Sequence, residues 1–214
     1  MKMIVFDLDG TLVDTVYDIG NSMNMALEFF GLPTHKLDMY YKFIGKGVVN
    51  LTRCAINNNE VSDEFLYQVL DKYNEIYPKN CTNLSSPYKN ITDVLDELIS
   101  KGYTLAVISN KPDKDTKYII NHYFPNRFTY VVGAKPDVER KPSKEAMEIL
   151  MKHLNVEISD ITYVGDSRFD AMFSINSGCQ YFLFEYGYEN SEILHSYKPI
   201  AFLKEAKDLL KYID

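Results

Sequence analysis

The sequence has few cysteines and no long apolar run. The first property bears on the cellular compartment of the protein, and the second on whether it enters a membrane. Its three cysteines are odd in number and form no Cys-x-x-Cys pair, which favours a reducing, cytoplasmic environment. A single lysine near the N-terminus is followed by an apolar run too short for a signal peptide or a membrane span. We therefore expect a cytoplasmic protein that does not associate with membranes.

Acidic residues outnumber basic ones, and the sequence has no histidine pattern typical of a metal site. The 214 residues carry a net charge of −7, which argues against a general binder of nucleic acid or of anionic membranes. The four histidines show no metal-ligand spacing. What is present is ordinary for a globular protein: 46% of the residues are hydrophobic and 25% are charged. The length suffices for one α/β domain with a modest insert.

The most informative stretch lies at the start of the chain. Residues 3–6 (Met-Ile-Val-Phe) form a short apolar run that predicts a buried strand of a parallel sheet. Asp7 and Asp9 follow it, and Gly10 allows a sharp turn or a close approach to a ligand. Ligands of open α/β sheets bind beyond the carboxyl ends of the strands. Two carboxylates this close repel each other unless a cation or a shared proton relieves them, so the pair predicts a metal site.

After this first turn the pattern changes from strand to helix. Apolar residues recur at helical spacing over four segments, namely residues 19–30, 37–44, 48–56 and 63–77. Ser62 is expected to cap the last of these helices, and Pro78 to end it. The all-helical insert predicts a small second domain over residues 16–81. The main domain then comprises residues 1–15 and 82–214.

From residue 91 onward, predicted strands and helices alternate. Four further buried strands are expected, at residues 104–108, 130–133, 161–164 and 181–184, and a closing helix over residues 203–212. Strands separated by helices of this length predict a parallel, doubly wound sheet with right-handed crossovers. The expected fold is thus an α/β protein with a doubly wound parallel sheet and a small helical domain inserted after the first strand.

Polar side chains follow four of the predicted strands. They are Asp7 with Asp9, Ser109 with Asn110, Lys141 before a proline, and Asp166 with Asp170. Because the carboxyl ends of parallel strands meet at one edge of a sheet, these residues should converge. An acid, a hydroxyl, a lysine and a second acid are the groups that phosphoryl transfer through an aspartyl-phosphate requires.

Some of these residues have structural alternatives when they are considered singly. Ser109 has the pattern of a helix cap, and Lys141 that of a solvated loop charge. Asp170 has the pattern of a helix cap or of an ion-pair partner for Arg168.

Together the four groups of residues resemble the four motifs of the haloacid dehalogenase superfamily of phosphohydrolases, and the insert resembles its small helical cap. The resemblance implies that Asp7 is the nucleophile and a direct Mg²⁺ ligand. It implies that Asp9 protonates the leaving oxygen, then activates water, and lends its backbone carbonyl to the metal. Asp166 is implied as a further metal ligand.

The resemblance also implies how phosphate is bound. Ser109 and Asn110 would hold the transferring phosphoryl group, helped by backbone amides at the next helix start. Lys141 would neutralise both the phosphate and the nucleophile. Asp170 would orient metal-bound water, and Thr11 would support the site from behind. Mg²⁺ suits such an all-oxygen site.

Several loops resemble those of one branch of the superfamily. Residues 44–48 (Ile-Gly-Lys-Gly-Val) resemble the specificity loop of bacterial phosphoglycolate phosphatases, as do residues 109–112 and 186–188 (Tyr-Gly-Tyr). Ser143 departs from the proline-rich continuation that often follows Lys-Pro in that branch. Lys46 is expected to hold a substrate carboxylate or second phosphate, or else to be a solvated loop residue.

Asp9 helps to separate related chemistries. True haloacid dehalogenases lack this aspartate and phosphonoacetaldehyde hydrolases replace it, so both are disfavoured. A β-phosphoglucomutase-like phosphotransferase and a pyrophosphatase or nucleotidase remain alternatives. Another class also remains, a non-catalytic signalling or binding module phosphorylated on aspartate. We predict a phosphoglycolate phosphatase-like, Mg²⁺-dependent phosphomonoesterase that acts on a small phosphorylated metabolite, as a monomer or homodimer.

Overall fold

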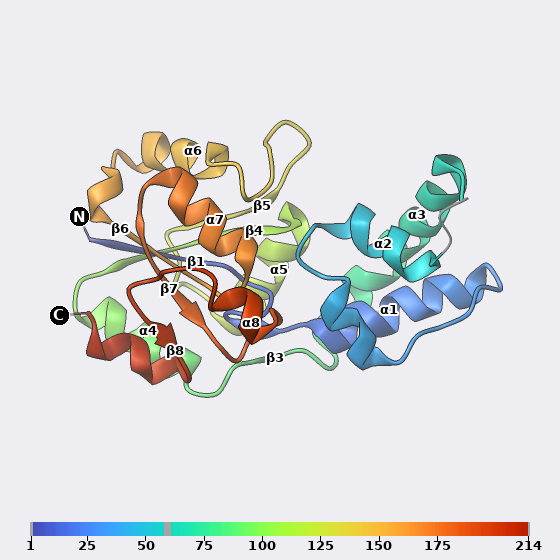
Figure 1. Cartoon of the computed structure of the whole chain (residues 1–214), viewed down its shortest axis with the longest axis horizontal. Coiled ribbons are helices and arrows are strands. Elements are labelled where there is room, and N and C mark those ends of the chain that lie inside the picture. Colours follow the sequence, from blue (N-terminus) through green and yellow to red (C-terminus); the bar gives the residue numbers. More distant parts are fainter. Residues whose placement is uncertain (1, 58–60, 214) are drawn as a thin grey trace. The chain divides into compact units, whose positions relative to one another are not determined.

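The computed structural model of the chain describes residues 2–57 and 61–213, and its main feature is a six-stranded sheet (Figure 1). The strand order is β5-β4-β1-β6-β7-β8, and neighbouring strands are parallel. The bounds are β1 Met3–Phe6, β4 Thr104–Pro112, β5 Tyr130–Ala134, β6 Ile161–Gly165, β7 Gln180–Phe184 and β8 Phe202–Leu203. The predicted doubly wound parallel sheet is confirmed.

β1 occupies the middle of this sheet, and its four apolar side chains are all buried. It pairs with β4 on one side and with β6 on the other. In this register Phe6 is the partner of Val107 in β4 and of Val164 in β6. The chain runs from β1 to β4 and β5 before it returns to β6, so the strand order reverses at β1. Open α/β sheets bind their ligands at the carboxyl ends of the strands beside such a reversal.

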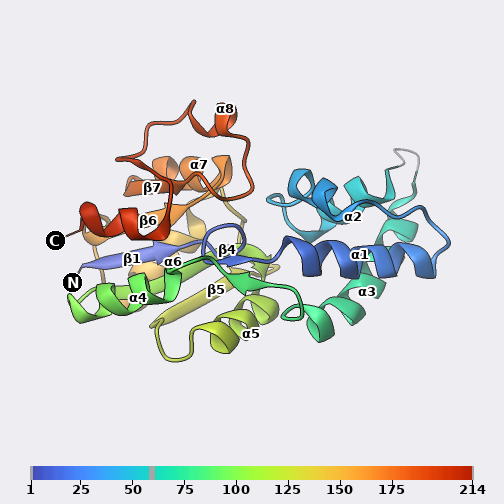
Figure 2. The same ribbon diagram turned by 90° about the horizontal axis from the view of Figure 1, so that it is seen from below.

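Helices lie along both faces of the sheet (Figures 1 and 2). The elements outside it are α4 Ile91–Ser100, α5 Asp113–Tyr123, α6 Glu145–Leu154, η2 Ile158–Asp160, α7 Arg168–Ser177, α8 Ser191–Leu194 and η3 Ala206–Lys211. In Figure 1, α6 and α7 run along one face, and α4 runs along the other. None of the helices in the described part of the chain combines the length and apolar composition that crossing a membrane requires.

A second compact unit, Asp14–Ser86, consists mainly of helices. Its elements are α1 Val16–Phe29, η1 Leu37–Lys42, α2 Val48–Ile56 and α3 Asp63–Asn80. The chain leaves the sheet-containing unit through β2 (Val13–Asp14) and returns through β3 (Ser86–Pro87), and these two short strands pair with each other. The helical insert predicted after the first strand is therefore a compact unit whose residues mainly contact one another.

α3 begins as the sequence predicts and ends later than expected. The Ser62 side chain accepts a hydrogen bond from the backbone N–H of Phe65, which confirms the predicted cap. The helix then continues through Pro78 to Asn80. A proline in the last turn removes one backbone donor, and the Asn80 side chain donates to the carbonyl oxygen of Ile76 in the same turn.

Two segments predicted as α-helices are tighter 3₁₀ turns, η1 and η3. The ring of Tyr40 in η1 contacts that of Phe43, three residues later and just after the end of η1. In η3 the buried Ala206 and Leu209 have the same spacing. A spacing of three residues matches the period of a 3₁₀-helix. Leu203, expected at the start of the closing helix, instead pairs with β7 as part of β8.

Candidate active site at the carboxyl end of the sheet

A tight turn after β1 carries the first pair of carboxylates. Asp7 extends the strand, because its backbone N–H donates to a carbonyl oxygen of β6 at 2.9 Å. The Leu8 carbonyl oxygen then accepts from the backbone N–H groups of residues 11–13 and closes the turn. Gly10 has a φ of +84°, and a Cβ there would overlap the Asp166 carboxylate. Only glycine therefore allows the turn to approach the end of β6 this closely.

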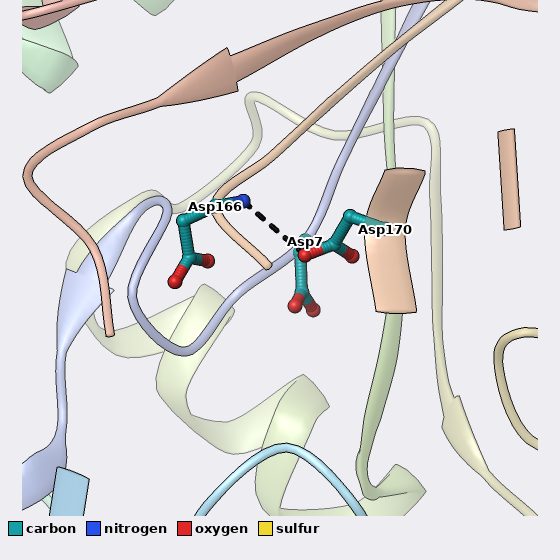
Figure 3. Close-up of side chains that lie close together, drawn as sticks. All are labelled: Asp7, Asp166 and Asp170. Carbon is teal, nitrogen blue, oxygen red and sulfur yellow. Dashed lines mark hydrogen bonds between the residues drawn. The ribbon is translucent and has the colours of Figure 1, made fainter. Parts of the chain in front are cut away.

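Three buried carboxylates meet where β1 and β6 end (Figure 3). Oxygens of Asp7, Asp166 and Asp170 all lie within 4.8 Å of one another. Asp7 comes from the turn after β1, Asp166 from the end of β6, and Asp170 from the first turn of α7. Buried carboxylates in such proximity require compensating positive charge.

Lys141 supplies part of that charge. Its Nζ lies 3.0 Å from Asp7 Oδ1, 2.7 Å from Asp170 Oδ1 and 2.8 Å from the Tyr163 hydroxyl oxygen. Its three N–H donors thus match three acceptors. Burial would lower the pKa of Lys141, but the charges of Asp170 and Asp7 outweigh burial and raise it. Lys141 is therefore a buried ammonium of the site, and the solvated-loop alternative is wrong.

Asp170 accepts hydrogen bonds on both of its oxygens. Oδ1 accepts from Lys141, while Oδ2 accepts from the Ser167 hydroxyl at 2.6 Å and from the backbone N–H groups of Ser167 and Asp166. Ser167 and Asp170 together form a capping box at the start of α7, so the helix-cap alternative is confirmed. Burial would raise the pKa of Asp170, but Lys141 outweighs burial and holds it below the usual range.

The other two carboxylates shift in the opposite direction. Burial raises the pKa of Asp7 to about 7, and the charge of Asp170 adds to this effect. Burial, followed by the charges of Asp170 and Asp7, raises the pKa of Asp166 well above its usual range. Three ionised carboxylates facing one ammonium would leave an excess of two negative charges. A divalent cation would neutralise that excess, and the donors are all the carboxylate oxygens that hard cations prefer, so the cluster fits a metal ion.

The end of β4 brings further side chains to this edge of the sheet. A register shift between residues 108 and 112 interrupts the pairing of β4 with β5. Ser109 is buried, and its Oγ accepts from the backbone N–H of Lys111. Asn110 bonds both backbone groups of Lys141: its Oδ1 accepts from the N–H at 2.8 Å, and its Nδ2 donates to the carbonyl at 3.1 Å. Asn110 thereby fixes the segment that carries Lys141, and its contact with phosphate stays a prediction.

Two other residues named from the sequence have different surroundings. Thr11 is fully buried, and its hydroxyl donates to Asp166 Oδ1 at 2.6 Å. Lys46 belongs to the helical unit, where it is exposed in the loop between η1 and α2. Its contact with substrate stays a prediction.

The family model of the haloacid dehalogenase-like hydrolases matches residues 4–184, which include the acidic cluster and Lys141. The chain belongs to this family. The phosphoglycolate phosphatase of Aliivibrio fischeri is 30% identical over 216 residues, 98% of this chain and 95% of its own. That of Vibrio vulnificus is 31% identical over 205 residues, 93% of this chain and 90% of its own. The family membership and these full-length relatives identify the chain as a phosphatase.

A solved structure agrees with this assignment. The crystal structure of a predicted phosphoglycolate phosphatase from Haemophilus somnus superposes with a TM-score of 0.93 at 28% identity. The match covers 100% of this chain and 98% of the other. The sheet and the insert described above thus belong to a fold that is shared along the whole chain.

Two buried residues of this phosphatase were not singled out from the sequence. Lys111 Nζ lies 3.0 Å from Asp9 Oδ1 and 3.3 Å from Oδ2, and its side chain is 3% exposed. The Tyr163 hydroxyl accepts from Lys141 and lies 3.0 Å from Asp170 Oδ1. A tyrosine inside a buried strand needs a polar partner for its hydroxyl, and this was the available signal for Tyr163.

Proposed function

We propose that the chain is a Mg²⁺-dependent phosphomonoesterase that hydrolyses a small phosphorylated carboxylic acid of the phosphoglycolate type. One observation carries the proposal. Asp7, at the end of the central strand, lies 3.0 Å from the Lys141 ammonium and within 4.8 Å of two further buried carboxylates. A carboxylate in this position has both the charge compensation and the cation site that attack on a phosphate requires. The phosphoglycolate phosphatases among its full-length relatives support the substrate class.

The proposed cation site uses Asp7, Asp166 and the backbone carbonyl of Asp9. Mg²⁺ is favoured because it prefers oxygen ligands and is commonly bound by one or two carboxylates together with substrate phosphate. When bound, Mg²⁺ would shield the negative phosphate from the negative nucleophile. Asp170 is assigned a supporting position, because its Oδ1 pairs with the Lys141 ammonium and its Oδ2 accepts from three donors at the start of α7. Each Asp166 oxygen accepts a single hydrogen bond.

The reaction then proceeds in two displacement steps. In the first, an Asp7 carboxylate oxygen bonds to phosphorus while the bond from phosphorus to the ester oxygen breaks. Asp9 donates its proton to that oxygen, and the alcohol leaves. In the second, Asp9 takes a proton from water, the water oxygen bonds to the same phosphorus, and the bond to Asp7 breaks. Inorganic phosphate is released, Asp7 is again a free carboxylate, and Asp9 again carries its proton.

Two groups would hold the phosphoryl oxygens during these steps. The Ser109 hydroxyl would donate one hydrogen bond, and the Lys141 ammonium would compensate the added charge. Lys141 is positioned for this role by Asp170 and Tyr163, which contact its Nζ, and by Asn110, which bonds its backbone.

The helical unit is proposed to act as the small cap of the family, with Lys46 in contact with the substrate carboxylate. The exposure of Lys46 and the glycines on either side of it support this assignment. Closure of a cap excludes water before phosphoryl transfer. A cytoplasmic location and a monomeric or homodimeric state belong to the same proposal.

The test is a panel of phosphate esters assayed with Mg²⁺, with excess EDTA, and with the variant Asp7→Asn. We expect 2-phosphoglycolate to be hydrolysed faster than ethyl phosphate, which lacks the carboxylate. EDTA should abolish turnover, and Asp7→Asn should lower kcat by about 10⁴-fold or more, as loss of a nucleophile does elsewhere. Asp96→Asn, in an exposed pair with Arg127, is the matched control and should retain activity. Hydrolysis that survives in Asp7→Asn, or transfer of phosphate between sugar positions without release, would contradict the proposal.

A further inference from the structure

The segment after β7 makes two hydrogen bonds to the site described above. It consists of residues 186–189 (Tyr-Gly-Tyr-Glu). The backbone N–H of Tyr188 donates to Asp166 Oδ2 at 2.8 Å, and the Tyr186 hydroxyl donates to the backbone carbonyl of Thr11 at 2.9 Å. Because the Thr11 hydroxyl bonds the other Asp166 oxygen, both Asp166 oxygens depend directly or indirectly on this segment.

The same segment approaches Asp166 more closely than a residue with a side chain allows. A Cβ on Gly187 would overlap the Cβ, the Cγ and a carboxylate oxygen of Asp166. A Cβ on Gly10 would overlap the carboxylate as well. Asp166 is therefore held between the backbones of two loops, each of which has a glycine at the point of closest approach.

An ion pair anchors the far end of the segment. Glu189 accepts from Arg168 Nε at 2.6 Å, from an Arg168 terminal nitrogen at 2.8 Å and from the Arg168 backbone N–H at 3.3 Å. Arg168 begins α7, two residues after Asp166. Two parallel hydrogen bonds between a guanidinium and a carboxylate fix the relative orientation of the groups. Arg168 therefore pairs with Glu189, and the alternative pairing with Asp170 considered from the sequence is not the arrangement observed.

Aromatic packing fixes the near end. The ring of Tyr186 stacks on Phe184 at a centroid distance of 4.5 Å and contacts Tyr88 at 4.3 Å. With its ring held on two sides, the Tyr186 hydroxyl is directed at the Thr11 carbonyl. The segment is thus immobilised at both ends, with Asp166 between them.

We propose that residues 186–189 form a clamp that orients Asp166 for the divalent cation, with Tyr186 and Glu189 as positioning residues. The inference rests on the proposed cation site and adds to it the elements that set its geometry. Partners that hold a metal ligand in place commonly change metal affinity or activity by about 10–100-fold when they are removed. The clamp should therefore be visible in cation affinity, independently of any substrate.

The experiment measures Mg²⁺ binding to EDTA-stripped protein by calorimetry, together with the Mg²⁺ concentration that half-saturates activity. Tyr186→Phe removes one hydroxyl and keeps the ring, and Glu189→Gln weakens the anchor. We expect each to weaken Mg²⁺ binding about 10-fold and to raise the half-saturating Mg²⁺ concentration equally. The kcat at saturating Mg²⁺ should stay near that of the unmodified protein, a separation that general loss of structure would not produce.

Two reference variants make the outcome decisive. Asp96→Asn removes the carboxylate charge from the bidentate Arg127 pair and should leave Mg²⁺ binding unchanged. Asp166→Asn should abolish Mg²⁺ binding. Unchanged Mg²⁺ affinity in both Tyr186→Phe and Glu189→Gln, with loss in Asp166→Asn, would overturn the clamp and leave the cation site standing. Unchanged affinity in Asp166→Asn would overturn the cation site and the clamp with it.

Discussion

Lys111 and Asp9 form the contact between single residues that bears most directly on the proton transfer proposed for Asp9. The lysine is buried at the end of β4, and its Nζ lies within 3.3 Å of both Asp9 oxygens. A side chain held by two such contacts keeps one orientation. Because a general acid must point at the leaving oxygen, we expect Lys111 to contribute to catalysis through the position of Asp9.

Lys111→Met should lower kcat about 10-fold for an alkyl phosphate, whose departing oxygen needs a proton. The loss should be much smaller for p-nitrophenyl phosphate, whose leaving group departs without one. Steady-state rates on the two substrates give the comparison. Lys111→Arg should retain part of the activity, and Lys117→Met, which removes an exposed partner of Asp113, is the control. Equal losses on both substrates would show that Lys111 has no specific link to the acid.

Among single residues, the sequence identified those candidate site residues that come soon after a predicted strand or before a proline. Asp7, Asp166 and Lys141 were predicted together, because the two aspartates follow predicted strands and Lys141 precedes a proline. The fold does bring them together. Tyr163 and Lys111 were not singled out. Their importance comes from partners distant in the chain, which no local pattern identifies. The predicted burial of residues 161–164 indicates only that the Tyr163 hydroxyl needs a polar partner.

Among the elements, α1 contains a buried carboxylate that no motif indicates. Asp18 accepts hydrogen bonds from the backbone N–H groups of Leu84 and Ser85 and from the Ser85 hydroxyl, at 2.7–3.0 Å. It thus ties α1 to the segment through which the chain leaves the helical unit. A carboxylate saturated by several donors stabilises the segment that it bonds.

Asp18→Asn should lower the free energy of unfolding by about 2 kcal/mol, because an amide presents donors to groups that are themselves donors. Urea unfolding followed by circular dichroism measures this change. Asp63→Asn, which weakens the exposed Arg53 pair in the same unit, should change stability by no more than about 0.5 kcal/mol. Similar effects of the two substitutions would contradict a special role for Asp18.

The order of the main helices and strands followed from periodicity, whereas the type of some elements and the ends of several others did not. α2 has the bounds expected from its apolar spacing. α3 runs past Pro78, because a proline near a helix end removes a single donor. The two 3₁₀ turns were expected as α-helices, since short segments with spacings of three and four residues look alike in sequence.

For the molecule as a whole, the cation site proposed at the buried cluster should link cation binding to pH. Burial raises the pKa of Asp7 from 3.8 to about 7, so without a cation the folded protein retains a proton there that the unfolded chain loses. The corresponding stability is fully present below about pH 4 and is lost as pH rises through about 7. A cation requires the ionised carboxylate, so its stabilising effect should grow over the same range.

We therefore expect the difference in Tm between Mg²⁺-loaded and EDTA-treated protein to widen from pH 5 to pH 8. Thermal unfolding at four pH values under both conditions measures it. The lowered pKa of Asp170 affects both conditions alike and cancels in the difference. In Asp7→Asn the difference should be smaller at every pH, and the pH dependence that remains comes from Asp166, whose pKa burial also raises. A constant difference in the unmodified protein would contradict the linkage.

The pairing of β2 with β3 has a consequence for how such enzymes diversify. Because the two strands are neighbours, the insert departs and returns through points about one strand spacing apart, roughly 4.8 Å. An inserted segment whose two ends lie this close together can be lengthened, shortened or replaced without displacing β1 or β4. The residues proposed to carry out hydrolysis lie in residues 1–13 and 87–214, so natural variation in the insert can change the proposed substrate contacts and leave the proposed hydrolytic residues in place.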